Sequence, residues 1–286
     1  MHQKFWQTSR RQIPIGVKTL IMSILNVTPD SFSDGGKFRS LDRALKQAES
    51  LIAEGADILD IGGESTRPNS AQVTAAEEIE RVVPVVEEIA KRFDVPISID
   101  TTKAEVAEKA LQAGAEIIND ISGLRFDAKI AEIAARTNAG LILMHSRGEF
   151  ETMHRQEPVA DVLNEVKRGL NWSLEKAFAF QVKWNQIALD VGIGFGKTFE
   201  QNLELLAKLN EICGVFPDFP MLVGTSRKSF IGKIVNGAAP EERLHGTMSS
   251  IAIAVFNGAK IIRVHDVRAA VETIRVAEAI RDEHSE

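Results

Sequence analysis

The chain contains eight short apolar runs, and stretches with the spacing of amphipathic helices separate them. Strands that alternate with helices form βαβ units and a parallel sheet. Eight such units close a (β/α)8 barrel. We therefore predict an α/β fold, a (β/α)8 TIM barrel with a short N-terminal extension that covers its lower end. The expected strands are Leu20–Leu25, Ile58–Ile61, Ile97–Ile99, Ile117–Asn119, Leu141–Met144, Ile187–Leu189, Met221–Val223 and Ile261–Val264.

Composition favours one barrel that fills the whole chain, residues 1–286. The 44% of hydrophobic residues can supply a large core, and no linker, low-complexity tract or block of like charge divides the 286 residues. A net charge of −6 argues against a nucleic-acid-binding protein. The single cysteine, Cys213, excludes an intrachain disulfide. No signal peptide is evident and the longest apolar runs are too short to cross a membrane, so we expect a cytoplasmic protein.

The ends of the apolar runs predict where the chemistry lies. In a barrel, the carboxyl ends of all strands lie at one face, where the βα loops build the active site. Two of those loops, Val27–Arg39 and Gly62–Thr74, are long and polar, and long loops in compact domains are normally functional. These features together predict an enzyme. The runs end at Asn26, Asp60, Asp100, Asn119, His145, Asp190, Gly224 and Arg263.

Asp100, Asn119 and Asp190 are three acceptor-bearing side chains on three different strand ends. Each alone could cap a helix, but three in one enclosed mouth would be costly without a ligand that brings several N–H donors. The guanidine-like edge of an aminopyrimidinone ring is such a ligand. The segment Val191–Thr198 ends in Gly-Lys-Thr but lacks the first glycine of a phosphate-binding loop, so we expect it to lie against a flat ring near Phe195.

Cationic and amide side chains at the same face predict an anion site. Alternation along the last strand puts Arg263 and His265 on one face, as a phosphate clamp would require. Ser226-Arg227-Lys228-Ser229 lies between a strand and a helix, although an ordinary solvated charge pair would look the same. The amide oxygen of Asn26 suits Mg²⁺ when phosphates supply the other ligands, although a lone Asn is usually a turn former. The histidines lack metal-ligand spacing, and neither His-Glu-x-x-His nor Cys-x-x-Cys occurs, so we do not expect zinc.

The motifs together resemble the dihydropteroate synthase family, the folate-pathway enzymes that sulfonamides inhibit. The resemblance runs from about Ile21 to Ala277 and rests on LNVTPDSFSDGG, DIGGESTRP, SIDTTK, INDISG, LMH, GIGFGK, SRKSFIG and RVHDV, in the family's order. It implies a homodimeric TIM-barrel transferase that uses Mg²⁺. The reaction it implies joins p-aminobenzoate to 6-hydroxymethyl-7,8-dihydropterin pyrophosphate and releases pyrophosphate, with C–O cleavage ahead of C–N formation.

The resemblance also implies roles for residues at matching positions. The implied catalytic residues are Asp100, Lys228, Arg263 and His265. The implied pterin site comprises Asp100, Asn119, Met144, Asp190, Phe195, Lys228 and Arg263. The implied pyrophosphate site comprises Asn26, which would also contact Mg²⁺, with Thr66, Arg67, Arg263 and His265. The implied p-aminobenzoate site comprises Thr66, Arg67, Pro68, Ser226, Lys228 and Phe195, with Ser226 at a helix start receiving the carboxylate.

Two other functions share part of this pattern. Methyltetrahydrofolate–corrinoid methyltransferases are pterin-binding barrels too, but they have no use for Asn26, the Thr66-Arg67 loop or the Arg263/His265 pair. A catalytically silent paralogue that binds pterins or a partner protein would keep the same fold. The chain departs from the family's usual residues at Thr102, Ser146 and Val191. None of these departures removes a polar group assigned above, so we expect at most a change in loop rigidity and pterin affinity.

Overall fold

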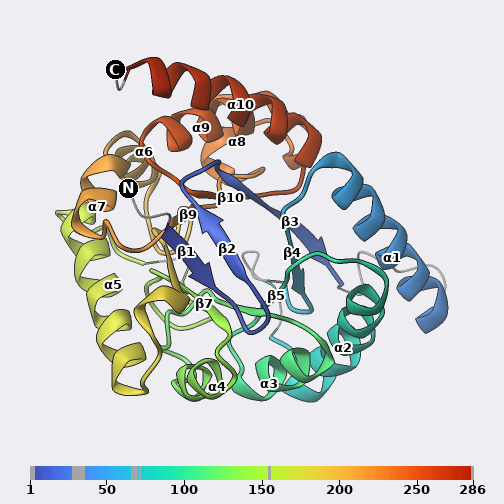
Figure 1. Ribbon diagram of the computed structural model, residues 1–286. Helices are drawn as coiled ribbons and strands as arrows, with labels where there is room; N and C mark the ends of the chain where they lie inside the picture. The colour runs from blue at the N-terminus through green and yellow to red at the C-terminus, as the bar shows by residue number, and fades with distance from the viewer. Residues whose placement is uncertain (1–3, 28–35, 66–69, 71, 154–155, 285–286) are drawn as a thin grey trace.

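The computed structural model describes residues 4–27, 36–65, 70, 72–153 and 156–284, without the side chains of 36–40 and 284. Within these ranges, eight parallel strands close a barrel in the order β10-β3-β4-β5-β6-β7-β8-β9, and helices surround it (Figure 1). The predicted (β/α)8 barrel is confirmed. The strands are β3 Leu20–Asn26, β4 Ile58–Gly62, β5 Ile97–Asp100, β6 Ile117–Asp120, β7 Gly140–Met144, β8 Ile187–Asp190, β9 Met221–Val223 and β10 Ile261–Val264.

The helices follow the amphipathic stretches of the sequence. They are α1 Gly36–Glu54, α2 Ala75–Arg92, α3 Ala104–Ala113, α4 Lys129–Thr137, α5 Val162–Ala179, α6 Phe199–Ala207, α7 Leu209–Val215, α8 Ser229–Ile234, α9 Leu244–Phe256 and α10 Val267–His284. The predicted Val27–Arg39 loop is too long, because α1 already begins at Gly36. The two ends of the predicted Gly62–Thr74 connection are confirmed, because β4 ends at Gly62 and Thr74 caps α2 by accepting the Glu77 N–H; residues 66–69 and 71 lie outside the described residues.

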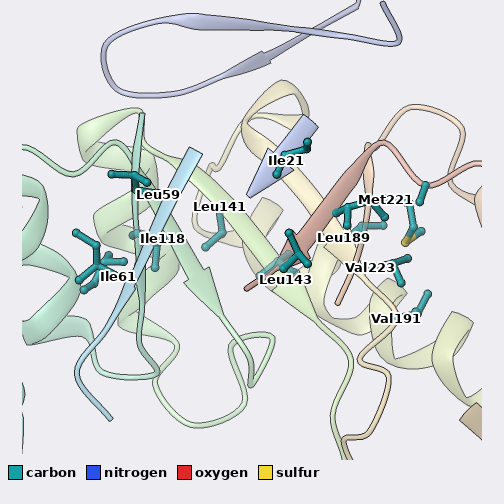
Figure 2. Close-up of a cluster of buried hydrophobic side chains, with 14 of the residues drawn as sticks. Ile21, Leu59, Ile61, Ile118, Leu141, Leu143, Leu189, Val191, Met221 and Val223 are labelled. Atoms are coloured by element: carbon teal, nitrogen blue, oxygen red, sulfur yellow. The ribbon is translucent and has the colours of Figure 1, made fainter. Parts of the chain in front are cut away.

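Each strand alternates between two apolar environments. Outward-facing side chains pack against the helices in one large buried cluster. Several of them, from Ile21 on β3 to Val223 on β9, are drawn in Figure 2. Inward-facing residues near the amino ends of the strands form a separate buried cluster, which includes Met22, Ile117 and Leu222. The same inward face turns polar toward the carboxyl ends, and this change in polarity creates a floor beneath the mouth of the barrel.

A β-hairpin closes the lower end of the barrel, as the sequence predicted for the N-terminal extension. Its strands β1 Lys4–Gln7 and β2 Gln12–Ile15 pair antiparallel and lie across that end (Figure 1). The Trp6 indole is 1% exposed and packs with the inward-facing apolar residues. Its Nε1 donates to the Gln186 carbonyl oxygen at 2.7 Å. The hairpin therefore excludes water from the lower half of the barrel and leaves the carboxyl end as the open face.

Among the helices that the structure describes, none combines the length and the apolar composition needed to cross a bilayer.

Candidate active site

The inward-facing residues at the carboxyl ends of β3 to β6 form one continuous row. Strand register pairs Asn26 with Gly62, Gly62 with Asp100, and Asp100 with Asn119. Because Gly62 has no side chain, a gap separates its two neighbours: a Cβ there would lie 3.7 Å from Asn26 Oδ1 and 3.8 Å from Asp100 Oδ2. Pairing between neighbouring strands thus places in one row residues that lie more than ninety positions apart in the sequence.

Arg263 on β10 reaches across the barrel into this row. Its Nε donates to Asp60 Oδ2 at 2.6 Å, and its Nη2 donates to Asp100 Oδ2 at 2.6 Å. Asn119 Nδ2 also donates to Asp60 Oδ2, at 3.1 Å. Asp60 is fully buried, so the guanidinium neutralises a carboxylate that water cannot reach. One cation therefore serves two carboxylates, and the cluster keeps a net negative charge.

This charge balance perturbs the titration of the cluster. Burial raises the pKa of Asp100 to about 7; Arg263 opposes the rise and Asp60 adds to it. Burial alone would lower the pKa of the Arg263 guanidinium, but the carboxylates of Asp60 and Asp100 outweigh it, and the pKa is raised. Asp100 consequently gains and loses its proton near neutral pH, while Arg263 stays charged.

Asp190 and Lys228 form the other side of the mouth. Asp190 ends β8, is 6% exposed, and its Oδ1 accepts the Gly192 N–H at 2.7 Å. The Lys228 ammonium lies 4.6 Å from the centre of the Phe195 ring and donates to the Ile193 carbonyl oxygen. Burial raises the pKa of Asp190 and lowers the pKa of Lys228 to about 8, and in each case the other residue's charge opposes the shift.

An apolar patch lies beside these charges. Met144, at the end of β7, belongs to a small buried cluster with Ile121 and Met153, and the Phe195 ring packs against that cluster. Flat apolar side chains next to carboxylates provide both stacking and hydrogen bonding, the combination that a heteroaromatic ligand requires.

The segments that follow the last two strands, β9 and β10, contribute a hydroxyl and an imidazole. Ser226 Oγ lies 2.9 Å from His265 Nδ1 and accepts the His265 backbone N–H at 3.2 Å. Ser226 precedes α8, whose N-cap residue is Lys228. The neighbouring Arg227 turns away to pair with Asp266 at 2.6 Å. Of the two cationic residues in this segment, Arg227 and Lys228, it is therefore Lys228 that faces the mouth.

A buried ion-pair network anchors the β4–α2 connection. Lys103 Nζ contacts Glu64 Oε2 at 2.9 Å and Glu78 Oε2 at 2.7 Å. Glu64 Oε1 accepts the Val73 N–H at 2.7 Å. Burial raises the pKa of Glu78, and Lys103 opposes that rise. The start and the end of the connection are therefore fastened to the barrel at one cation.

Comparison with known proteins identifies the family. Residues 22–265 match the profile of the family described as pterin binding enzyme. The dihydropteroate synthase of Synechocystis sp. is 48% identical over 265 residues, which cover 93% of this chain and 91% of that protein. The chain belongs to the dihydropteroate synthase family. It is a transferase of folate biosynthesis.

Solved structures of the family agree with this fold. Dihydropteroate synthase from Yersinia pestis, in complex with a sulfonamide drug, superposes with a TM-score of 0.90 at 42% identity, covering 97% of this chain and 99% of that one. The Xanthomonas albilineans dihydropteroate synthase with 4-aminobenzoic acid gives a TM-score of 0.90 at 36% identity, with 98% of each chain covered.

Most residues that the dihydropteroate synthase resemblance implies lie at the mouth of the barrel. Thr66, Arg67 and Pro68 lie outside the described residues. One expectation needs correction: Ser226 is not at a helix start, since α8 begins only at Ser229. The residues that the structure brings to the mouth are Asn26, Asp100, Asn119, Met144, Asp190, Phe195, Ser226, Lys228, Arg263 and His265.

Strand alternation does not place Arg263 and His265 on one face as the sequence predicted. β10 ends at Val264, so alternation does not extend to His265. The two side chains have different partners, Asp60 and Asp100 for Arg263 and Ser226 for His265. Their joint action on a phosphate stays a prediction.

Sequence reasoning missed the role of Asp60. It treated Asp60 as a strand end only, whereas the carboxylate is the buried partner of both Arg263 and Asn119. Asn119 was expected to act as an acceptor, and its amide nitrogen also donates, to Asp60. The available signal was an aspartate that interrupts the apolar run of β4 at an inward-facing position. The departure Ser146 has a local role, because its Oγ accepts from Arg125 Nη2 at 2.9 Å.

Proposed function

We propose that this family member joins p-aminobenzoate to 6-hydroxymethyl-7,8-dihydropterin pyrophosphate and releases pyrophosphate, with C–O cleavage ahead of C–N formation. The observation that carries the proposal is the set of inward-facing carboxylates, Asp60, Asp100 and Asp190, placed with two cations in one mouth. The 4-aminobenzoic acid bound to the Xanthomonas relative supports one of the two substrates.

The acceptors at the mouth suit the N–H-rich edge of a pterin. Asp190 accepts one backbone N–H, and its second oxygen is available to a ligand. Asn119 uses its nitrogen on Asp60 and keeps its carbonyl oxygen for a donor. The Phe195 ring and Met144 would pack against the flat heterocycle. A hydrogen-bonded edge with an apolar face gives the selectivity for a pterin that the reaction needs.

The leaving group would lie between β3, β5 and β10. Among the described residues, Nη1 of Arg263 has no acceptor, so this N–H₂ group can donate to a diphosphate oxygen. Asn26 Oδ1 and Asp100 Oδ2 flank Gly62 and offer oxygen donors of the type that Mg²⁺ prefers. In the described part of the chain, no three His, Cys, Asp or Glu side chains gather around a metal position.

That donor set fits an ion that takes most of its ligands from diphosphate and water. When bound, Mg²⁺ would neutralise charge on the departing diphosphate. The protein's own residues would orient the substrate and hold charge: Arg263 toward the diphosphate, and Lys228 near the amine substrate. His265, held by Ser226 through Nδ1, would lie beside the diphosphate, as the family resemblance implies.

Breaking the C–O bond first makes the pterin methylene cationic, and a poor arylamine nucleophile can then add. Asp100 would face this cation. Opposite charges ~4 Å apart at an effective dielectric of ~20 gain about 4 kcal/mol, or about three decades in rate. Because the pKa of Asp100 is raised to about 7, a substantial share of the carboxylate is ionised at physiological pH.

One assay tests the function directly. Purified protein is incubated with the pterin pyrophosphate, with and without p-aminobenzoate and Mg²⁺, while pyrophosphate and dihydropteroate are measured. Mg²⁺-dependent dihydropteroate formation is expected. Its absence in protein of normal melting temperature would reject the function. We also expect p-aminobenzoate to bind only after Mg²⁺ and pyrophosphate; if it binds equally well without them, this binding order is rejected while the function stands.

Asp100→Asn tests the role of the carboxylate. We expect kcat to fall by about three decades, because the Coulombic gain worked out above is lost. The variant should still fold, with a melting temperature close to that of wild type. Asp94→Asn is the matched control, because Asp94 precedes the same strand at its other end and its side chain is 93% exposed. Unchanged turnover in Asp100→Asn would remove Asp100 from the mechanism.

The assembly would be a homodimer, as in the family resemblance. Exposed apolar side chains on two packed helices support it: Ile253 and Phe256 on α9, and Val276 and Ile280 on α10. Light scattering at micromolar concentration should give twice the monomer mass of 31.4 kDa. A monomer mass would reject the dimer.

A further inference from the structure

The ammonium of Lys197 is surrounded by backbone carbonyls. Its Nζ donates to the carbonyl oxygens of His145 at 3.1 Å, Gly192 at 2.8 Å and Phe195 at 2.9 Å. These three bonds use the three N–H donors of an ammonium. Sequence reasoning excluded a nucleotide loop here but gave this lysine no role, and the contacts now supply one.

The three carbonyls belong to two different elements. Gly192 and Phe195 lie in the β8–α6 loop, whereas His145 follows β7. Lys197 thus holds two carbonyls of its own loop together. It also ties that loop to the segment that follows β7. The loop fits closely against β7: a Cβ at Gly192, where φ is +67°, would lie 1.9 Å from the His145 carbonyl oxygen.

The Gly192–Lys197 loop makes several contacts with residues of the active site. The Gly192 N–H donates to the Asp190 carboxylate at 2.7 Å, and the Ile193 carbonyl oxygen accepts from the Lys228 ammonium. The Phe195 ring lies under that same ammonium, 4.6 Å away. A shift of the Gly192–Lys197 loop would therefore displace three contacts together: the acceptor for Lys228, the donor to Asp190 and the Phe195 ring.

The charge of Lys197 acts on dipoles, since its three contacts are carbonyls. Burial lowers the pKa of Lys197, and the nearby charge of Asp190 opposes the shift. An ammonium suits this place because three carbonyl oxygens converge on a single nitrogen. The planar fork of an arginine presents its donors in a fixed, wider geometry.

We propose that Lys197 is a positioning residue, which holds the Gly192–Lys197 loop in the form that orients Phe195 and Lys228 toward the substrates. The inference rests on the proposed function and adds a part of its machinery that touches no substrate. Lys197 acts only through the loop and does not bind phosphate.

Lys197→Met is the first test, with Lys208→Met as the matched control. Lys208 lies at the end of α6, and its ammonium is half-exposed and paired with Glu204 at 2.8 Å. We expect Lys197→Met to lower kcat/KM for p-aminobenzoate by about 10- to 100-fold, by analogy with the loss when residues that orient metal ligands are removed. Lys208→Met should stay within twofold of wild type. Kinetics are measured at least 20 °C below each melting temperature, so that loss of folded protein does not contribute.

A double-mutant cycle separates positioning from general destabilisation. Phe195→Leu is combined with Lys197→Met. If Lys197 acts through Phe195 and the loop, kcat/KM of the double variant should lie within threefold of the value for the less active single variant. The proposal would be overturned if the fold-losses in kcat/KM of the two single variants multiplied in the double variant. It would also be overturned if kcat/KM of Lys197→Met stayed within twofold of wild type.

Chemical rescue covers the case in which Lys197→Met fails to fold. In a Cys213→Ala background, Lys197→Cys is alkylated while unfolded, with either an aminoethyl or a carbamidomethyl group, and then refolded. The aminoethyl form restores an ammonium of lysine length and should recover kcat/KM to within threefold. The carbamidomethyl form should remain at least tenfold lower, and equal activity of the two forms would overturn the proposal. A wild-type protein that makes no dihydropteroate would instead reject the proposed function.

Discussion

Replacing Arg263 with methionine should destabilise the barrel in a pH-dependent way. The guanidinium side chain is 23% exposed and lies 2.6 Å from each of two carboxylates, Asp60 at 0% and Asp100 at 14% exposure. Methionine keeps much of the side-chain length, so packing changes little while the positive charge is lost. Two carboxylates would then face each other without a counterion.

The size of the effect follows from that burial. Removing one partner of a buried ion pair typically costs about 3–5 kcal/mol, because the remaining charge stays buried without compensation. A domain has only about 5–15 kcal/mol of stability in total, so the variant should lose a large fraction of it. The exposed pair between Arg92 and Glu88 provides the control, since Arg92→Met should leave stability close to wild type.

The pH dependence gives the effect its sign. An aspartate whose folded pKa exceeds its unfolded value of 3.8 is penalised only when ionised in the folded state. The penalty grows as pH rises above the unfolded pKa and is complete above the folded pKa. In wild type the pKa of Asp100 is already about 7, and loss of Arg263 raises it further. The gap between wild type and Arg263→Met should therefore be larger at pH 8 than at pH 5.5.

Urea unfolding followed by tryptophan fluorescence measures this gap at both pH values. The double variant Asp60→Asn/Arg263→Met removes one of the two carboxylates and should recover at least about 1 kcal/mol relative to Arg263→Met. A loss that is equal at pH 5.5 and pH 8, or a double variant that is less stable than the single one, would refute the reasoning.

Three further outcomes follow from the structure. If the Asp100 carboxylate and the Lys228 ammonium are both required, kcat/KM should rise as pH increases through about 7 and fall above about 8; a profile that is flat from pH 6 to 9 contradicts this. Gly192→Ala should lower the melting temperature and kcat/KM, because its Cβ would lie 1.9 Å from a carbonyl oxygen, whereas the helical Gly214→Ala, with nothing within 4 Å, should not. Trp6→Ala should cost about 3–5 kcal/mol in urea unfolding, and an unchanged midpoint would show that the hairpin does not stabilise the barrel.

Apolar runs predicted all eight barrel strands, because parallel strands buried on both faces are nearly continuous in hydrophobic residues. The predicted ends were short by one residue at several strands. Asn26, Asp100 and Asp190 belong to the strands that they end, because backbone pairing continues to the polar residue. Polarity marks a change of environment, whereas a strand ends where its hydrogen bonds end.

The partners within the site could not be predicted in the same way. That Arg263 serves Asp60 and Asp100 depends on strand register and on closure between β10 and β3, neither of which a linear pattern contains. The role of Lys197 depends on a loop whose glycines turn its carbonyls inward. Family resemblance supplied the residues at the mouth, and geometry supplied the connections among them.

The contact between Trp6 and Gln186 has a consequence for how the protein is made. Trp6 is translated 180 positions before Gln186, whose backbone carbonyl oxygen accepts its hydrogen bond. Until β8 emerges, the aromatic side chain has no completed barrel to enter, and pairing of the first barrel strand with the last must wait longer still. The growing chain therefore exposes the apolar side of the hairpin until β8 is translated, and the hairpin can close a complete barrel only after β10 has paired with β3.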